Sequence, residues 1–223
     1  MTFDIANLRL RLISSLVLAP LVLLAVYFGG VLYVLVVVAA VALATQEWLN
    51  LTRADFKLRL LGIPYVCGFG LALLYIRDIP VDGRTYIYYL LAVVWGTDIG
   101  AYVAGRLIGG PKLAPRVSPN KTWAGLFGGI VLACMFGYAM VAAIIGVLPP
   151  PGMAVVLSAS LAILSQIGDL FESWVKRRAG VKESGNLIPG HGGILDRIDG
   201  LIFAVSSFAL LCWAVGAGRF GAP

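Results

Sequence analysis

Long apolar runs recur along the whole of this 223-residue chain, and they constrain its fold more than any other feature. A hydrocarbon layer about 30 Å thick needs roughly 20 apolar residues in a helix, and fewer where flanking side chains reach the interface. Seven stretches come close to that length, and we interpret each as a membrane-spanning helix. They are Leu12–Phe28, Val31–Leu49, Leu60–Ile76, Tyr86–Leu107, Trp123–Leu148, Met153–Leu170 and Leu201–Ala217. The sequence therefore predicts an all-α, polytopic membrane protein with about seven spans.

Composition agrees with lipid as the main solvent of this chain. Hydrophobic residues make up 60% of it and charged residues only 13%, against about 25% charged residues in an ordinary soluble domain. Because the apolar runs continue along the chain, a cleavable secretory signal followed by a globular domain does not fit. The three cysteines lack the paired spacing of a zinc or disulfide framework, so we interpret them as small buried hydrophobes. They are Cys67, Cys134 and Cys212.

The second stretch, Val31–Leu49, is the least secure of the seven. Gln46 and Glu47 intrude near its end. The chain could therefore bend into the membrane interface at Trp48, and a six-span protein would follow if this stretch failed to cross.

Basic residues are distributed unevenly between the two ends of the predicted spans. An amino terminus in the cytoplasm places 14 of the 17 Lys and Arg residues on that side, which favours an odd number of spans and an external carboxyl terminus. The 14 are Arg9, Arg11, Arg53, Lys57, Arg59, Arg106, Lys112, Arg116, Lys121, Lys176, Arg177, Arg178, Lys182 and Arg197. Topology and anionic lipid headgroups explain the net charge of +6, so no nucleic acid partner is expected. We treat residues 1–223 as one integral membrane domain, with N-terminal spans in 1–85 and catalytic spans and loops in 86–223.

Asp98 is an acidic residue inside a predicted span, where a charge is costly and usually faces a polar cavity, a metal or a partner charge. Tyr102 lies one helical turn further on, close to the same face. Glycines at positions 96, 100, 105 and 109 would let another backbone come near. A packing stripe of small residues explains these glycines but explains the aspartate poorly, so we expect Asp98 to belong to a functional site.

A second acid, Asp169, stands near the carboxyl end of the sixth stretch. Helical spacing puts Ser165, Asp169, Ser173 and Lys176 along one face where the helix would leave the membrane. Glu172, taken alone, fits an ordinary solvated helix end. The polar stripe indicates that Asp169 faces a site.

Asp196 and Asp199 open directly into the last stretch, three residues apart and so on one face of a helix. Complementarity to the helix dipole explains acids in a first turn, but it does not explain four acids at one predicted membrane level. Hard oxygen ligands at this density suit Mg²⁺. We therefore predict Asp169, Asp196 and Asp199 as metal ligands, and Asp98 as a further ligand or as an organiser of the substrate site. Two such metal sites could form a pair.

Two segments around these acids could bind phosphate. In Ser118–Thr122, the side chains of Ser118, Asn120, Lys121 and Thr122 precede the fifth stretch, where the amino end of a helix favours anions. His191, the one histidine of the chain, is flanked by glycines that would let the backbone approach a ligand. It could contact phosphate or donate a proton, or it could serve the loop structurally.

The segment from Ser173 to Asp199 resembles the signature of the phosphatidate cytidylyltransferases, also called CDP-diacylglycerol synthases. The matching pieces are Ser173, Lys176, Arg177, Lys182, Pro189, His191, Gly192, Gly193, Asp196, Arg197 and Asp199. The Asp98 segment, Ser118–Thr122 and the segment around Asp169 are also similar to family motifs. Glu183 stands where the family usually has aspartate.

The resemblance implies transfer of the cytidylyl group from CTP to phosphatidate, which gives CDP-diacylglycerol and pyrophosphate. It implies a Mg²⁺-dependent site at the cytoplasmic membrane surface, a second ion that could be monovalent, and a location in a bacterial plasma membrane. Asp169, Asp196, Asp199, Lys176 and His191 are the expected catalytic residues. The expected substrate-binding residues are Asp98, Ser118, Asn120, Lys121, Thr122, Ser173, Arg177, Lys182 and Arg197. Membrane lipids are expected partners, and a homodimer stays open.

Other functions remain possible at this point. A related CTP-dependent transferase could act on another lipid phosphate, such as an isoprenoid ether lipid, and a polyprenol kinase could have a similar site. From a different class, a transporter would also carry acids within its spans. A CDP-alcohol phosphatidyltransferase is disfavoured, because no alanine and arginine follow Asp199 and Gly200 at the positions that its signature requires.

Overall fold

The computed structural model describes residues 5–80, 82–143, 150–187 and 192–216, which form seven helices and two short strands. The apolar runs are long enough to cross the hydrocarbon layer of a membrane, and they set the lengths of the helices. Their bounds are α1 Ile5–Phe28, α2 Gly30–Leu51, α3 Phe56–Asp78, α4 Gly83–Leu107, α5 Trp123–Ala143, α6 Pro151–Arg178 and α7 Leu195–Ala214; the strands are β1 Lys112–Ala114 and β2 Ser118–Thr122.

Six helices, α2 to α7, are long and apolar enough to cross a membrane. The whole of α1 spans 24 residues, and Leu16–Phe28 is the apolar part of it whose side chains the structure describes. The helical, multi-span prediction is therefore confirmed in its coarse form, as a mostly helical integral membrane protein with six candidate spans within the described residues. The bend considered for the second stretch does not occur, because α2 runs unbroken past Glu47 and Trp48 to Leu51.

Trp48 explains why α2 does not bend towards the interface. Its ring is buried and packs against Gly62 of α3, where any added side chain would collide with the indole. The indole N–H donates to the carbonyl oxygen of Leu58 at 2.9 Å. Tyr65 and Phe171 cover the ring at centroid distances of 5.1 and 6.2 Å. The tryptophan is thus a core residue that joins α2, α3 and α6.

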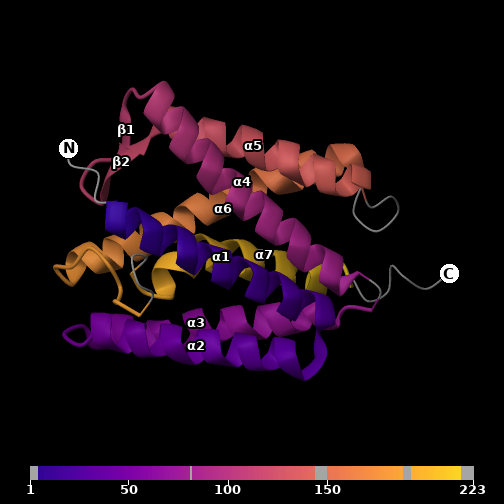
Figure 1. Ribbon diagram of the computed structural model, residues 1–223, viewed down its shortest axis with the longest axis horizontal. Helices are drawn as coiled ribbons and strands as arrows, with labels where there is room; N and C mark the ends of the chain where they lie inside the picture. Colours follow the sequence, from indigo (N-terminus) through magenta and orange to yellow (C-terminus); the bar gives the residue numbers. More distant parts are fainter. Residues whose placement is uncertain (1–4, 81, 144–149, 188–191, 217–223) are drawn as a thin grey trace.

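The helices run roughly along the long axis of the molecule, with α2 and α3 at one side and α4 and α5 at the other (Figure 1). Neighbouring helices pack in the order α2, α3, α7, α6, α5 and α4, and α7 also touches α4 and α2. The carboxyl-terminal helix is therefore central, and the acids at its first turns are surrounded by other elements.

Small residues bring α4 and α5 into close contact. A Cβ at Gly100 would collide with the backbone of Gly128, and one at Gly129 would come within 2.8 Å of the carbonyl oxygen of Thr97. Because backbone cannot yield as a side chain can, these positions require glycine. The expectation that glycines of α4 admit another backbone is confirmed here, but it is wrong for Gly109, which has open space around it and a φ of +67° just after the helix ends.

The segment between α4 and α5 corrects the all-α prediction. Strands β1 and β2 form a small antiparallel hairpin in which Lys112 pairs with Thr122 and Ala114 with Ser118. A turn closes it, with the amide of Val117 donating to the carbonyl oxygen of Ala114 at 3.1 Å. The predicted donors of Ser118–Thr122 therefore lie on a strand that leads into α5.

The connections between successive helices lie alternately at the two ends of the molecule. The hairpin, the turn between α2 and α3, and the segment between α6 and α7 lie together at the left of Figure 1. This end carries the basic residues that the sequence places on one side of the membrane. The polar residues of α4, α6 and α7 discussed below also gather here.

Candidate active site

A polar cavity of about 380 Å³ opens at the hairpin end of the bundle. Strand β2 and helices α4, α5, α6 and α7 all contribute to its walls. The lining residues are Asp98, Ala101, Tyr102, Asn120, Lys121, Thr122, Gly125, Leu126, Gln166, Asp169, Asp196, Arg197 and Asp199. The four acids that the sequence singled out thus meet in one cavity, although they come from three helices.

Lys121 ties the hairpin to α6. Its ammonium lies 2.6 Å from Oδ2 of Asp169 and donates to the side-chain oxygen of Gln166 at 3.1 Å. The hydroxyl of Ser173 donates to the other Asp169 oxygen at 3.3 Å. These contacts agree with the predicted polar stripe, because α6 continues through Arg178 and keeps Asp169 and Ser173 on one face.

Asp196 is held by an unusually full set of donors. Its Oδ1 lies 2.6 Å from the ammonium of Lys176. Its Oδ2 accepts from the amide and the hydroxyl of Ser184 and from the amide of Gly193, each at 2.9 Å. A carboxylate with this many charge-assisted and backbone hydrogen bonds is fixed in place. Asp196 therefore joins Lys176 of α6 to the segment before α7.

Asp98, Asp199 and Arg197 are engaged much less by the protein. Within the described residues, Asp98 and Arg197 form no ion pair or hydrogen bond through their side chains, and both are exposed to the cavity. Asp199 accepts from the amide of Gly200 at 2.8 Å. These three groups are consequently available to ligands.

Several predicted site residues make structural contacts or lie outside the cavity lining. The hydroxyl of Thr122 caps α5 by accepting from the amide of Gly125 at 3.0 Å. Arg177 donates to the carbonyl oxygens of Val117 and Val181 and so ties α6 to the hairpin turn. The predicted residues outside the cavity lining are Ser118, Ser173, Lys176, Arg177 and Lys182. His191 lies outside the described residues.

Glu172 corrects one sequence-based interpretation. It was expected at an ordinary solvated helix end, but its side chain is completely buried. The ammonium of Lys176 is 3.4 Å from Oε1 of Glu172, yet neither carboxylate oxygen accepts a hydrogen bond from the part of the chain that the structure describes. A buried acid with so little compensation is costly. Hydropathy could not reveal it, because helix position alone does not show which face a neighbouring helix covers.

The donor set fits a magnesium ion that also binds substrate. Among the described residues, no three acidic, histidine or cysteine side chains are arranged to hold a metal by themselves. Mg²⁺ is commonly bound by one or two carboxylates together with waters and substrate phosphates. The lightly engaged carboxylates of Asp98 and Asp199 suit that mode, while the metal-ligand roles of all four acids stay predictions.

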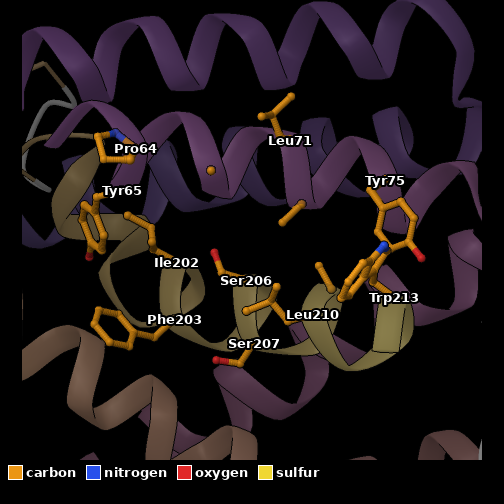
Figure 2. A pocket seen from close by; sticks show the side chains of 13 residues that line it. Pro64, Tyr65, Leu71, Tyr75, Ile202, Phe203, Ser206, Ser207, Leu210 and Trp213 are labelled. Atoms are coloured by element: carbon orange, nitrogen blue, oxygen red, sulfur yellow. The ribbon is translucent and has the colours of Figure 1, made fainter. Parts of the chain in front are cut away.

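A larger hollow, of about 560 Å³, runs between α3 and α7 and has a different character. None of the described residues that line it is charged, and its walls are mainly aliphatic and aromatic, from Tyr65 at one end to Tyr75 and Trp213 at the other (Figure 2). The rings of Tyr65 and Phe203 in its wall pack against Phe171 of α6 at 5.4 and 5.9 Å. This groove lacks groups for phosphate chemistry, so the polar cavity is the candidate active site.

Comparison with known proteins shows which family this chain belongs to. The model of the cytidylyltransferase family matches residues 54–215, which include every residue that lines the polar cavity. The chain belongs to this family. The resemblance found in the sequence is thereby confirmed, whereas the role of each site residue stays a prediction.

Relatives within the family extend the similarity to nearly the whole chain. A phosphatidate cytidylyltransferase of Brucella suis is 40% identical over 250 aligned residues, covering 90% of this chain and 92% of the relative. One of Rickettsia bellii is 35% identical over 208 residues, covering 88% and 87%. One of Bacillus subtilis is 46% identical over 131 residues, covering 58% of this chain and 48% of the relative.

Proposed function

We propose that this protein is a phosphatidate cytidylyltransferase, which transfers the cytidylyl group from CTP to phosphatidate and releases pyrophosphate. The near full-length similarity to enzymes of that name carries the proposal. The polar cavity adds a physical basis, because it combines acids and cations at the end of a membrane bundle.

The location of the cavity suits two substrates that arrive from different phases. CTP is a soluble polyanion, whereas phosphatidate keeps its tails in lipid and its phosphate at the membrane surface. A site at the ends of spanning helices can receive both. We propose that this end faces the cytoplasm, because it carries most of the basic residues, and that the membrane is a bacterial plasma membrane.

In the proposed reaction, a phosphate oxygen of phosphatidate attacks the α-phosphorus of CTP. A new phosphorus–oxygen bond forms, and the bond from the α-phosphorus to the oxygen bridging the β-phosphate breaks. Pyrophosphate leaves with that electron pair. No protein nucleophile is needed, so the protein contributes by positioning the phosphates and stabilising their charge.

Two cations that line the cavity, and a third beside it, have distinct parts in this scheme. Arg197 has no protein partner among the described residues and is free to bind a phosphate. Lys121 is held by Asp169 and Gln166 at the rim between hairpin and α6, so it presents a fixed charge. Lys176 is fixed by Asp196 and Glu172 and stabilises the acidic side of the site.

Asp98 and Asp199, with Asp169 beside them, would hold Mg²⁺ in this site. When bound, the metal supplies positive charge to the phosphate oxygens. A second ion, which could be monovalent, belongs to the same proposal, as does a homodimer. The acids would in addition repel a wrongly placed phosphate and so restrict how the triphosphate enters.

Pyrophosphate release tests the function directly. Protein purified into phosphatidate-containing nanodiscs should release pyrophosphate from CTP in the presence of Mg²⁺, and nanodiscs without phosphatidate should give none. Release with polyprenyl phosphate instead of phosphatidate would point to another lipid phosphate as substrate. Folded protein that releases no pyrophosphate with either lipid would overturn the proposal and leave transport as the better account.

A further inference from the structure

Glu47 is a buried acid from the amino-terminal half of the chain, and it lies beside the segment that carries the catalytic candidates. Only 7% of the residue is exposed. One carboxylate oxygen accepts from the amide of Ile194 at 2.9 Å, and the other accepts from the amide of Leu195 at 2.9 Å. Glu47 therefore binds the first residues of α7 from a helix that is nearly 150 positions away in sequence.

The surroundings of Glu47 are shaped to admit its carboxylate. A Cβ at Gly185 would come within 2.9 Å of Oε1, and a Cβ at Gly193 would collide with Oε2 and with the hydroxyl of Ser184. Glycine at these two positions leaves room for the acid. The positive end of the α7 dipole and two backbone amides also compensate its charge.

Ser184 links Glu47 to the cavity. Its hydroxyl oxygen lies 3.1 Å from Oε2 of Glu47 and 2.9 Å from Oδ2 of Asp196. Because a hydroxyl has one proton, it can donate to only one of these carboxylates at a time. The amide of Ser184 also donates to Asp196, and Asp196 in turn holds the ammonium of Lys176 at 2.6 Å. An unbroken series of contacts thus runs from α2 to Asp196 in the cavity wall and on to the buried Lys176 beside it.

We propose that Glu47 is a positioning residue for the active site, acting through Ser184 and Asp196 on Lys176. Glu47 does not line the cavity and touches no reacting atom. It fixes the segment before α7 so that Asp196 keeps its donors and Lys176 keeps its direction. The proposal rests on the proposed function for its kinetic consequence, but its structural content is independent of it.

The simpler alternative is that Glu47 only stabilises the amino end of α7, as an acid near any helix start would. The two accounts differ in a measurable way. A stabilising contact changes how much protein is folded, whereas a positioning contact changes the turnover of each folded molecule.

Glu47→Gln is the decisive variant, because it keeps the side-chain size while replacing one acceptor oxygen with a donor. That NH₂ group would face a backbone amide or the Ser184 hydroxyl. We expect kcat per folded molecule to fall about tenfold, the effect of losing one charge-assisted hydrogen bond. Gln46→Ala, at the exposed neighbouring position of α2, is the matched control and should keep the wild-type kcat.

Coupling to Ser184 gives a second readout. Ser184→Ala should lower kcat by several-fold, and the double variant with Glu47→Gln should be no worse than about twofold below the poorer single variant, because both changes break one series of contacts. Additive losses would overturn the proposal. So would a kcat per folded molecule equal to the wild type. If Glu47→Gln fails to fold, Ser184→Ala alone decides by the same kcat criterion.

Hydrogen exchange separates this proposal from the proposed function. In folded Glu47→Gln, the amides of Gly193, Ile194 and Leu195 should exchange faster than in the wild type, whether or not the protein transfers a cytidylyl group. Unchanged protection would refute the positioning role. A wild-type protein without cytidylyl transfer would refute the proposed function and leave the exchange result to decide the role of Glu47.

Discussion

Individual carboxylates of the cavity differ in how much protein already binds them. Asp196 has both oxygens engaged, Asp169 is paired with Lys121, and Asp98 and Asp199 have little engagement. Groups that the protein leaves free are the ones that a metal or a polar substrate can use without displacing an existing contact. This difference suggests separate roles for four residues that look alike in sequence.

Asp199→Asn should lower turnover by about 100-fold, because the carboxylate charge is lost where the proposed chemistry needs it. The amide oxygen can still accept from Gly200, so the helix start should persist. Initial rates of pyrophosphate release at saturating CTP and Mg²⁺ measure the effect. Asp78→Asn, at an exposed position at the far end of α3, is the control and should match the wild type. Near-normal turnover of Asp199→Asn would remove this residue from the site.

Lys121→Met should raise the KM for CTP about tenfold or more, since one charge-assisted contact to phosphate is lost and Asp169 loses its partner. Lys112→Met removes the same charge from the exposed strand β1 of the same hairpin. It should change KM little. Equal effects of the two variants would mean that Lys121 acts only through the overall charge of this end.

Residues such as Asp98, Asp169, Asp196 and Asp199 could be singled out from sequence because acids are rare among apolar spans. Glu47 and Glu172 could not, because their significance depends on which helix covers them. Glu47 contacts the start of α7 across nearly the whole chain, and no local pattern contains that information. For Glu172, the burial comes from packing of α6 against its neighbours.

The positions of the helices could be predicted from hydropathy. A membrane span must form its backbone hydrogen bonds within itself, and its length must match the thickness of the bilayer. The β1–β2 hairpin was missed. Its strands are only three and five residues long and contain or adjoin prolines, so neither alternation nor apolar content marks them. What places them is the pairing between them and the contact of Lys121 with α6.

The contact between α4 and α5 sets the position of Asp98 relative to the hairpin. Gly100→Ala should lower the free energy of unfolding by about 2 kcal/mol, because the new methyl group meets the backbone of Gly128. Thermal unfolding in detergent measures it. Gly68→Ala has open space within α3 and should be neutral or slightly stabilising, by about 0.5 kcal/mol. If both variants behave alike, the close approach of the helices is not required.

For the whole molecule, the separation of charge between the two ends leads to a topology prediction. In a variant with the three native cysteines replaced by alanine, Arg116→Cys should react with an impermeant maleimide only after cells are permeabilised. Asp78→Cys should react in intact cells. Both positions are exposed, at opposite ends of the bundle. The reverse pattern would place the cavity outside and contradict the positive-inside argument.

In the proposed reaction, the α-phosphate of CTP moves to the lipid while the β- and γ-phosphates leave together. The most direct measurement supplies phosphatidate nanodiscs with CTP labelled either at the α- or at the γ-phosphorus, and then separates lipid from water-soluble products. Cytidylyl transfer places the α-label in CDP-diacylglycerol and the γ-label in pyrophosphate. Label from the γ-position in the lipid would instead show a kinase and contradict the account.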